Sequence, residues 1–317
     1  MTAARRTILL GLLASVSAAT LPSSGEGQSA IAIGGTRMAQ LITEIFLVDE
    51  DYGLAYGHNR VQALVIFVND LVERYFYYEE LPPKVVQSYY VDYYMVQVLN
   101  GDIHQFVWNS RWHPLIVESV SAGLQEMGVH DQAVLFNKVR DFVERDRGRL
   151  NAFLESDYGS STDREYMEAL SKISGDFFDS FTAPPDGAHG AKIANANAAW
   201  ISTWPEVRWV TPEQYRQELE RLAALVPDLA VRKQRAEENR PWQQKRIDDV
   251  VARSGQELLM LTGIERAASV AGMSGELWHI VTNRGHHRVI LANREALMLQ
   301  GERDEIIARV PAPEAKP

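Results

Sequence analysis

Between residues 59 and 181, apolar side chains recur every three or four positions, which is the spacing of helices that each bury one face. The first stripe contains Val61, Leu64, Val65, Val68 and Leu71. Pro82-Pro83 and Gly128 interrupt the pattern, and both are signals that end helices. Because the interruptions are short, residues 59–181 are predicted to form an antiparallel helical domain.

The next segment, residues 182–210, loses this periodicity. It is rich in Pro, Gly and an Ala-Asn repeat, which predicts a linker or long loop. Trp200, Trp204 and Trp209 are too apolar for a free linker, so part of this segment is expected to pack against the protein.

The region 211–310 changes from helical to alternating periodicity. Thr211-Pro-Glu-Gln214 has the pattern of a capping box, and a second helix is predicted over 242–261. Strands are predicted at 277–282 and 288–292, around an Asn-Arg-Gly turn. Residues 302–310 fit a third strand or a final helix, and the Pro- and Ala-rich tail 311–317 is predicted to be disordered. The predicted fold is mainly α: an antiparallel helical domain followed by a smaller α+β region with a C-terminal β-hairpin.

The N-terminus has the pattern of a signal peptide over residues 1–19. Arg5-Arg6 precede a short apolar run, and Ser17-Ala18-Ala19 follow it. The paired arginines favour the twin-arginine route. Residues 20–58 are expected to form a Gly- and Ser-rich leader and a first structural element. The protein is therefore expected to be periplasmic or secreted, with membrane contact only during export. The alternative is a buried or disordered N-terminal helix in a cytoplasmic protein.

Composition and motifs exclude several classes of site. The chain has no cysteine, which removes disulfides, thiol nucleophiles and thiolate metal sites. The formal net charge of -10 argues against direct nucleic-acid binding. Neither a phosphate-binding loop nor a nucleophile elbow, dinucleotide fingerprint or zinc-protease helix is present. The sequence therefore predicts no catalytic residue, cofactor or metal.

The segment from Asn100 to Ser110 stands out from its surroundings. Asn100-Gly101 suits the end of one helix, and Asp102 can cap the next. Gln105 is placed to bond back to the cap residue, while Phe106 and Asn109 share one face. These residues predict a capped corner between two helices.

This segment resembles the signature of the bacterial DNA-mimic protein C-terminal domain family. The chain keeps the family residues Asn100, Gly101, Gln105, Phe106, Asn109 and Ser110. Asp102 stands where the family favours a second Gly. The resemblance covers roughly residues 61–181. It implies an all-α, often dimeric domain that presents carboxylates to a DNA-binding protein.

The distribution of charge gives little support to the DNA-mimic role that the resemblance implies. Residues 59–160 contain 14 Asp and Glu against 9 Lys and Arg, an excess of five negative charges. A mimic of DNA needs carboxylates spaced like phosphates with few cations between them. Because the charges here are of mixed sign, we expect this chain to share the family's fold rather than its binding role.

Seven of the twelve tyrosines lie between Tyr75 and Tyr94. The candidate interface residues among them are Tyr89, Tyr90, Tyr93 and Tyr94. Their spacing fits a core face whose hydroxyls reach its rim, and it also fits a partner-binding or dimer surface.

Together these patterns favour an exported, non-enzymatic protein-binding module. Its acidic, tyrosine-bearing helical face is expected to meet a basic protein, and a homodimer is compatible with the same face. One alternative is an immunity- or inhibitor-like binding protein. Another is an uncharacterised envelope hydrolase that uses His104 and nearby carboxylates.

Overall fold

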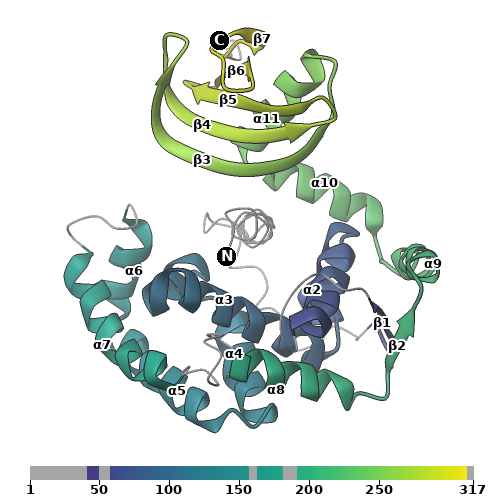
Figure 1. The fold of residues 1–317 in the computed structure, drawn as a ribbon, viewed down its shortest axis with the longest axis vertical. Helices are drawn as coiled ribbons and strands as arrows, with labels where there is room; N and C mark the ends of the chain where they lie inside the picture. The colour runs from purple at the N-terminus through teal and green to yellow at the C-terminus, as the bar shows by residue number, and fades with distance from the viewer. Residues whose placement is uncertain (1–40, 50–57, 157–162, 181–190, 313–317) are drawn as a thin grey trace. The chain divides into compact units, whose positions relative to one another are not determined.

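The computed structural model describes residues 41–49, 58–156, 163–180 and 191–312 (Figure 1). The chain divides into two compact units. One is a helical unit, residues 35–229, and the described part of the other is a C-terminal unit that starts at residue 230. Each unit has its own hydrophobic core. The prediction of a mainly α fold with a smaller α+β region is confirmed.

The helical unit has one large core beneath its helices. Its helices are α2 (His58–Glu73), α3 (Pro83–Asn109), α4 (Pro114–Glu126), α5 (His130–Arg145), α6 (Arg147–Glu155), α7 (Arg164–Ser180), α8 (Ala191–Ser202) and α9 (Pro212–Ala223), with a 3-10 turn, η2 (Tyr78–Glu80), before α3. The apolar stripe predicted from residue 61 onward is the buried face of α2, where Leu64, Phe67 and Val68 have no exposed surface. Pro83 starts α3 and Pro114 starts α4 at the first helical position, where a missing N–H costs nothing.

Residues 191–210, which were predicted to be linker or loop, form a helix and a strand. The Ala-Asn repeat is one packed face of α8: Ala194, Asn197 and Ala198 are buried. Asn197 accepts a bond from the Ser88 hydroxyl at 2.6 Å and donates to the Ser88 carbonyl at 3.1 Å. Because small residues allow close helix packing, a run that looks featureless in sequence docks α8 tightly against α3.

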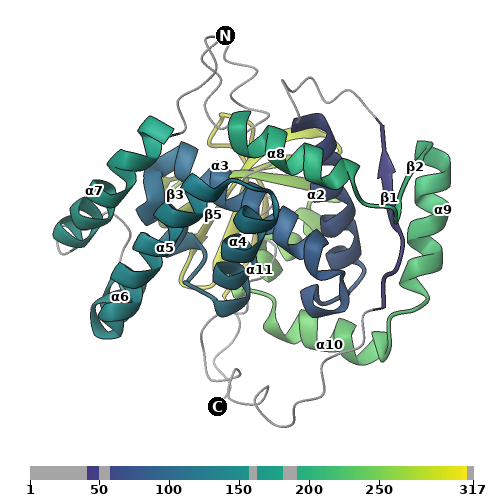
Figure 2. The same cartoon turned by 90° about the horizontal axis from the view of Figure 1, so that it is seen from below.

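A two-stranded parallel sheet also belongs to the helical unit. Strand β1 (Ile45–Val48) pairs with β2 (Val207–Val210), so that Ile45 is opposite Val207. Figure 2 shows the two strands side by side with α9 next to them. The capping box predicted at Thr211-Gln214 is present at the start of α9, and Tyr215 of α9 bonds to Asp70 of α2 at 2.7 Å. Helix α9 is therefore part of the helical unit, although the sequence placed it in the C-terminal region.

The C-terminal unit is a five-stranded antiparallel sheet with helices before it. Its elements are α10 (Leu229–Asn239), α11 (Trp242–Arg253), β3 (Leu258–Val270), β4 (Met273–Thr282), β5 (Gly285–Ala292), β6 (Glu295–Gln300) and β7 (Ile306–Val310). The strands follow one another in chain order across the sheet. Ile247, Val250 and Val251 of α11 pack on one face of the sheet, against Ile280 and Val289 (Figure 1).

The predicted hairpin is confirmed as β4–β5, but it is the middle of a larger sheet. The predicted helix over 242–261 ends at Arg253, and residues 258–261 begin β3. Residues 302–310 contain strand β7, not a final helix. The β5–β6 turn has Asn293 and Arg294 at φ 50 and 64, a left-handed pair that matches the twist of a hairpin. Such a turn carries no glycine signal, which is why the sequence pattern missed it.

Among the described residues, no helix combines the length and the apolar character that a membrane span requires. The predicted signal peptide, residues 1–19, and most of the leader lie outside the described residues.

The close approach of α3 and α4 depends on Gly123. A Cβ at this position would lie 2.7 Å from Val91 Cγ2 and 3.2 Å from the Gln87 carbonyl oxygen. We expect Gly123→Ala to destabilise the protein, because overpacking costs about 1–3 kcal/mol and outweighs a gain of up to about 1 kcal/mol in helix propensity. Denaturant unfolding followed by circular dichroism measures the change.

Gly175→Ala is the matched control. Gly175 also lies within a helix, α7, but a Cβ added there would meet no other atom within 4 Å, so this variant should be as stable as the wild type or slightly more stable. If Gly123→Ala unfolds at the same denaturant concentration as Gly175→Ala, the close approach does not constrain α3 and α4.

Candidate functional site

The signature segment forms a kink inside α3. Gly101 (φ -157, ψ 30) and Asp102 (φ 70, ψ 175) leave the helical region, and the helix resumes at Ile103. The predicted break is confirmed, but it is only two residues long. We call Gly101 and Asp102 the α3 kink.

Asp102 adopts a backbone conformation that favours glycine. Its positive φ with an extended ψ falls in a region that side-chain-bearing residues rarely occupy, at a cost of about 1–3 kcal/mol. Its carboxylate accepts bonds from the Ile103 amide at 2.6 Å and from the Ser171 hydroxyl of α7 at 2.7 Å. The predicted capping role of Asp102 is thus present, and the same side chain ties the α3 kink to α7. The second Gly that the family favours suits this conformation, whereas Asp102 adds the link.

Behind the kink lies an amide cluster formed by Gln97, Gln105 and Asn109. The buried Gln97 Oε1 accepts bonds from Gln105 Nε2 at 2.9 Å and from Asn109 Nδ2 at 2.5 Å. A Cβ at Gly101 would lie 1.9 Å from Gln105 Oε1, so a larger residue there would displace the Gln105 side chain from the amide cluster. The polar residues of the signature therefore hold the two parts of α3 together.

The apolar and terminal signature residues also serve the fold. Phe106 has no exposed surface and makes edge contacts with Tyr94 and Phe136. Ser110 is buried at the end of α3, where its hydroxyl accepts a bond from the Trp112 amide at 3.2 Å. Asn100, the last residue before the kink, is exposed.

His104 lies two residues after the kink. Burial lowers the pKa of His104, and the neighbouring Asp102 carboxylate opposes that shift. Asp102 also binds the Ser171 hydroxyl, so the structure brings a carboxylate, a histidine and a serine into one neighbourhood. Among the described residues, no group of His, Asp and Glu is arranged to hold a metal ion.

Three of the four candidate interface tyrosines are buried. Tyr89 is 3% exposed, Tyr90 4% and Tyr94 0%, while Tyr93 is half-buried. Tyr89 donates to Asn69 Oδ1 at 2.9 Å, and its ring meets that of Tyr90 edge-on at 5.2 Å. Burial raises the pKa of Tyr89 and of Tyr90. Of the two alternatives that the sequence left open, core packing describes these three side chains.

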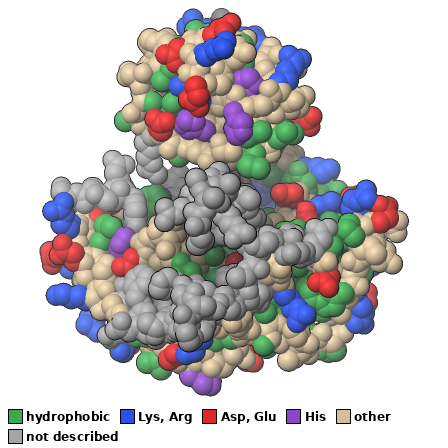
Figure 3. Space-filling model, viewed as in Figure 1, with side chains coloured by type: hydrophobic (Ala, Val, Ile, Leu, Met, Phe, Trp, Pro, Cys, Tyr) green, Lys and Arg blue, Asp and Glu red, His purple; other side chains and the backbone are tan. Residues whose placement is uncertain are grey.

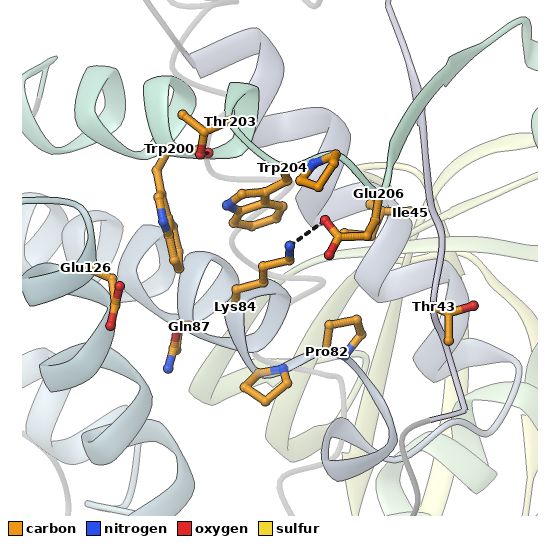
Figure 4. Close-up of a pocket in the computed structure, with 12 residues that line it drawn as sticks. Thr43, Ile45, Pro82, Lys84, Gln87, Glu126, Trp200, Thr203, Trp204 and Glu206 are labelled. Carbon is orange, nitrogen blue, oxygen red and sulfur yellow. Dashed lines mark hydrogen bonds and ion pairs between the residues drawn. The ribbon is translucent and has the colours of Figure 1, made fainter.

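A separate pocket of about 500 Å³ lies at the start of α3, away from the kink. Its lining includes Lys84, Gln87, Glu126, Trp200, Trp204 and Glu206. We call it the tryptophan pocket (Figure 4). The sequence predicted that part of the segment containing Trp200, Trp204 and Trp209 packs against the protein, and Trp209 is 41% exposed. The sequence gave no sign of the charged residues that join Trp200 and Trp204, because these come from three separate segments of the chain.

Charges in the tryptophan pocket are arranged around the two indole rings. Lys84 Nζ lies 2.5 Å from Glu206 Oε2 and 5.2 Å from the centre of the Trp204 ring. The bond from Lys84 lowers the pKa of Glu206. The Trp200 and Trp204 rings meet edge-to-face at 4.9 Å, and Figure 4 shows the Trp204 indole nitrogen on the edge that faces Trp200. Glu126 is exposed at the end of α4.

Substitutions at Asp102 test the strain in the α3 kink. Asp102→Ala removes the bond acceptor and keeps a side chain in the unfavourable conformation, whereas Asp102→Gly removes the acceptor and relieves the strain. We expect the Gly variant to be more stable than the Ala variant by about 1–2 kcal/mol in denaturant unfolding. Ser171→Ala serves as the control that removes the bond from α7 to Asp102 and leaves residue 102 itself unchanged. Equal stability of the Ala and Gly variants would show that residue 102 is unstrained.

The half-buried Asp92 on α3 gives a dependence of stability on pH. Burial raises the pKa of Asp92 to about 7, well above its ordinary value of 3.8. The folded state therefore binds this proton more tightly than the unfolded state, and the stability contributed by Asp92 falls as pH rises from about 4 to about 7. Asp92→Asn removes this dependence.

We expect Asp92→Asn to stabilise the protein relative to the wild type by more at pH 8 than at pH 5. One pKa unit corresponds to about 1.4 kcal/mol, and partial solvent exposure reduces the total. Denaturant unfolding of both proteins at the two pH values measures the difference. A stability difference that is the same at both pH values would rule out the raised pKa.

The model of a protein family described as DMP19-like protein matches residues 79–203. Neither a curated protein nor a solved structure matched the chain. The matched segment begins at η2 and ends just after α8, so compared with the resemblance over 61–181 it leaves out α2 and includes α8. It contains the α3 kink, the amide cluster and Trp200 of the pocket, while Trp204 is the first residue after it. Over residues 79–203, less than half of its length, the chain therefore resembles the DMP19-like protein family.

Proposed function

We propose that the helical unit is a non-enzymatic protein-binding module whose exposed carboxylates on α4 take a basic protein partner. The observation that carries this proposal is the scarcity of cations over α3 and α4. Between Lys84 and Lys138 the chain has a single Lys or Arg, Arg111. Its guanidinium lies 4.4 Å from the centre of the Trp108 ring and bonds to the Leu154 carbonyl.

The exposed carboxylates of this region are Glu118 and Glu126 of α4, followed by Asp131 at the start of α5. Asp131 forms an ion pair with Lys192. Helix α4 itself contains no Lys or Arg. Glu118 and Glu126 are therefore free of neighbouring cations on their own helix, which favours the approach of a positively charged surface.

Cations elsewhere on the helical unit make phosphate mimicry a weaker account than general charge complementarity. Glu144 pairs with Arg140 at 3.3 Å and with Arg147 at 3.5 Å, and Arg149 pairs with Glu165 at 3.2 Å. Figure 3 shows basic and acidic side chains interleaved on the visible face of this unit. A continuous track of carboxylates is what a copy of DNA requires, so the proposal is limited to a basic protein.

The roles of the signature residues support a non-enzymatic module. Gln105 and Asn109 bond to Gln97, and Asp102 bonds to Ser171 and to the backbone. These bonds satisfy polar groups within the fold. If residues 1–19 direct export, as their pattern indicates, the partner is a periplasmic or secreted protein.

Charge reversal tests this proposal. The full chain captures proteins from cell extract at about 0.1 M and about 1 M salt, where the Debye length is about 10 Å and about 3 Å. We expect basic proteins to be retained at low salt and released at high salt. The double variant Glu118→Lys/Glu126→Lys should fail to retain basic proteins at either salt concentration.

The matched control is Glu302→Lys/Glu305→Lys, which makes the same change in net charge on an exposed turn of the C-terminal unit. It should retain the basic proteins at low salt. Loss of capture in both double variants would mean that only net charge matters, and retention in both would mean that the partner does not use α4. Either result contradicts the proposal.

A further inference from the structure

We propose that the tryptophan pocket takes an arginine side chain of a partner protein, with its guanidinium between the Trp200 ring and the Glu126 carboxylate. This inference rests on the proposed protein-binding function and identifies the central contact of that interface.

One half of the pocket already holds a cation in this way. Lys84 lies 5.2 Å from the centre of the Trp204 ring and 2.5 Å from the Glu206 carboxylate. An aromatic face and a carboxylate together favour a cation, because the ring quadrupole and the negative charge both attract it. Lys84 thus shows within the chain which chemistry the pocket accepts.

The other half of the pocket has the same two components without a cation. Trp200 is half-buried, and Glu126 lies on its side away from Lys84 in Figure 4. Within the described part of the chain, Glu126 makes no ion pair. With Glu206 neutralised by Lys84, the charged lining retains one negative charge, that of Glu126.

The end of α4 adds to this preference for a cation. Glu126 is the last residue of α4, where the unpaired carbonyl groups of a helix carry a partial negative charge. Gln87 also lines the pocket and offers an amide oxygen as a further acceptor. A carboxylate, an amide oxygen and a helix C-terminus are all acceptors or negative groups, so an apolar or acidic occupant would leave them unsatisfied.

Arginine matches this lining better than lysine does. Its planar guanidinium stacks on an indole ring and directs its N–H groups in the ring plane toward a carboxylate. The edge-to-face contact with Trp204 holds the Trp200 ring in place, which reduces the entropy lost on binding. The volume of about 500 Å³ is within the range of sites that enclose a large side chain or small ligand.

A tripeptide titration tests the inference on the full chain. The probe is acetyl-Gly-Arg-Gly-amide, and its neutral analogue carries citrulline in place of arginine. The readout is the indole N–H resonance of Trp200 in NMR spectra, assigned by its loss in Trp200→Phe. We expect the arginine peptide to shift this resonance and to bind at least about tenfold more tightly than the citrulline peptide, which corresponds to about 1.4 kcal/mol.

Two conservative variants separate the pocket from general charge. Glu126→Gln should weaken the binding of the arginine peptide several-fold, whereas Glu73→Gln, at the exposed end of α2 and outside the pocket lining, should leave its affinity unchanged. Unchanged indole resonances of the other tryptophans establish that each variant is folded. Equal affinity for the two peptides, equal effects of the two variants, or no shift of Trp200 overturns the inference.

The two proposals fail in different ways. If the peptide does not bind but charge reversal on α4 still abolishes capture of basic proteins, the pocket assignment is wrong and the proposed function stands. If the peptide binds through Glu126 but no charge-dependent capture occurs, the pocket assignment stands and the proposed function is wrong.

Discussion

The break in α3 is the constraint on which the helical unit depends. A helix that passes through the core must satisfy its backbone groups wherever it leaves helical geometry, because unpaired polar groups inside a protein are costly. At the α3 kink the Asp102 carboxylate accepts a bond from the Ile103 amide and so meets part of this requirement. The Gln97 side chain accepts from the Gln105 and Asn109 side chains, which joins the two parts of the helix across the kink. The signature is therefore a solution to a local packing problem.

The close approach of α3 and α4 links this scaffold to the tryptophan pocket. Gly123 lets α4 pack directly over Val91 and the Gln87 backbone. Glu126 lies three residues after Gly123, so the same contact brings the end of α4 to the part of α3 that carries Lys84 and Gln87. A glycine that would be expected to weaken a helix thus helps to place the Glu126 carboxylate in the same pocket as the two indole rings.

Local pattern was sufficient for the helices and insufficient for contacts between distant segments. The stripe of α2, the proline starts of α3 and α4 and the break after Asn100 all follow from nearest-neighbour spacing. The pairing of Ile45 with Val207 joins residues far apart in sequence, and short apolar runs do not specify their partners. The packed face of α8 was obscured because Ala194, Asn197 and Ala198 carry no strong apolar signal.

In the candidate site, too, the sequence revealed what depends on neighbouring residues and missed what depends on distant ones. The sequence singled out the signature, whose residues lie within one short segment, and the tyrosines, which recur at helical spacing. Tyr89, Tyr90 and Tyr94 are buried. The polar signature residues bond within the fold, Gln105 and Asn109 to Gln97 and Asp102 to Ser171, so these groups serve the scaffold. The pocket was not predictable in this way, since Lys84, Glu126 and Trp200 share no motif and meet only in the folded chain.

The difference between the signature, which the sequence revealed, and the tryptophan pocket, which it did not, has a physical basis. Residues that stabilise a kink must lie within a few positions of it, so they form a short signature. A binding pocket draws its side chains from whichever elements meet at its rim, and its chemistry depends on their combined charge. For this chain, a motif therefore identifies the scaffold, while the arrangement of Glu126, Trp200, Lys84 and Glu206 determines which side chain of a partner would be attracted to it.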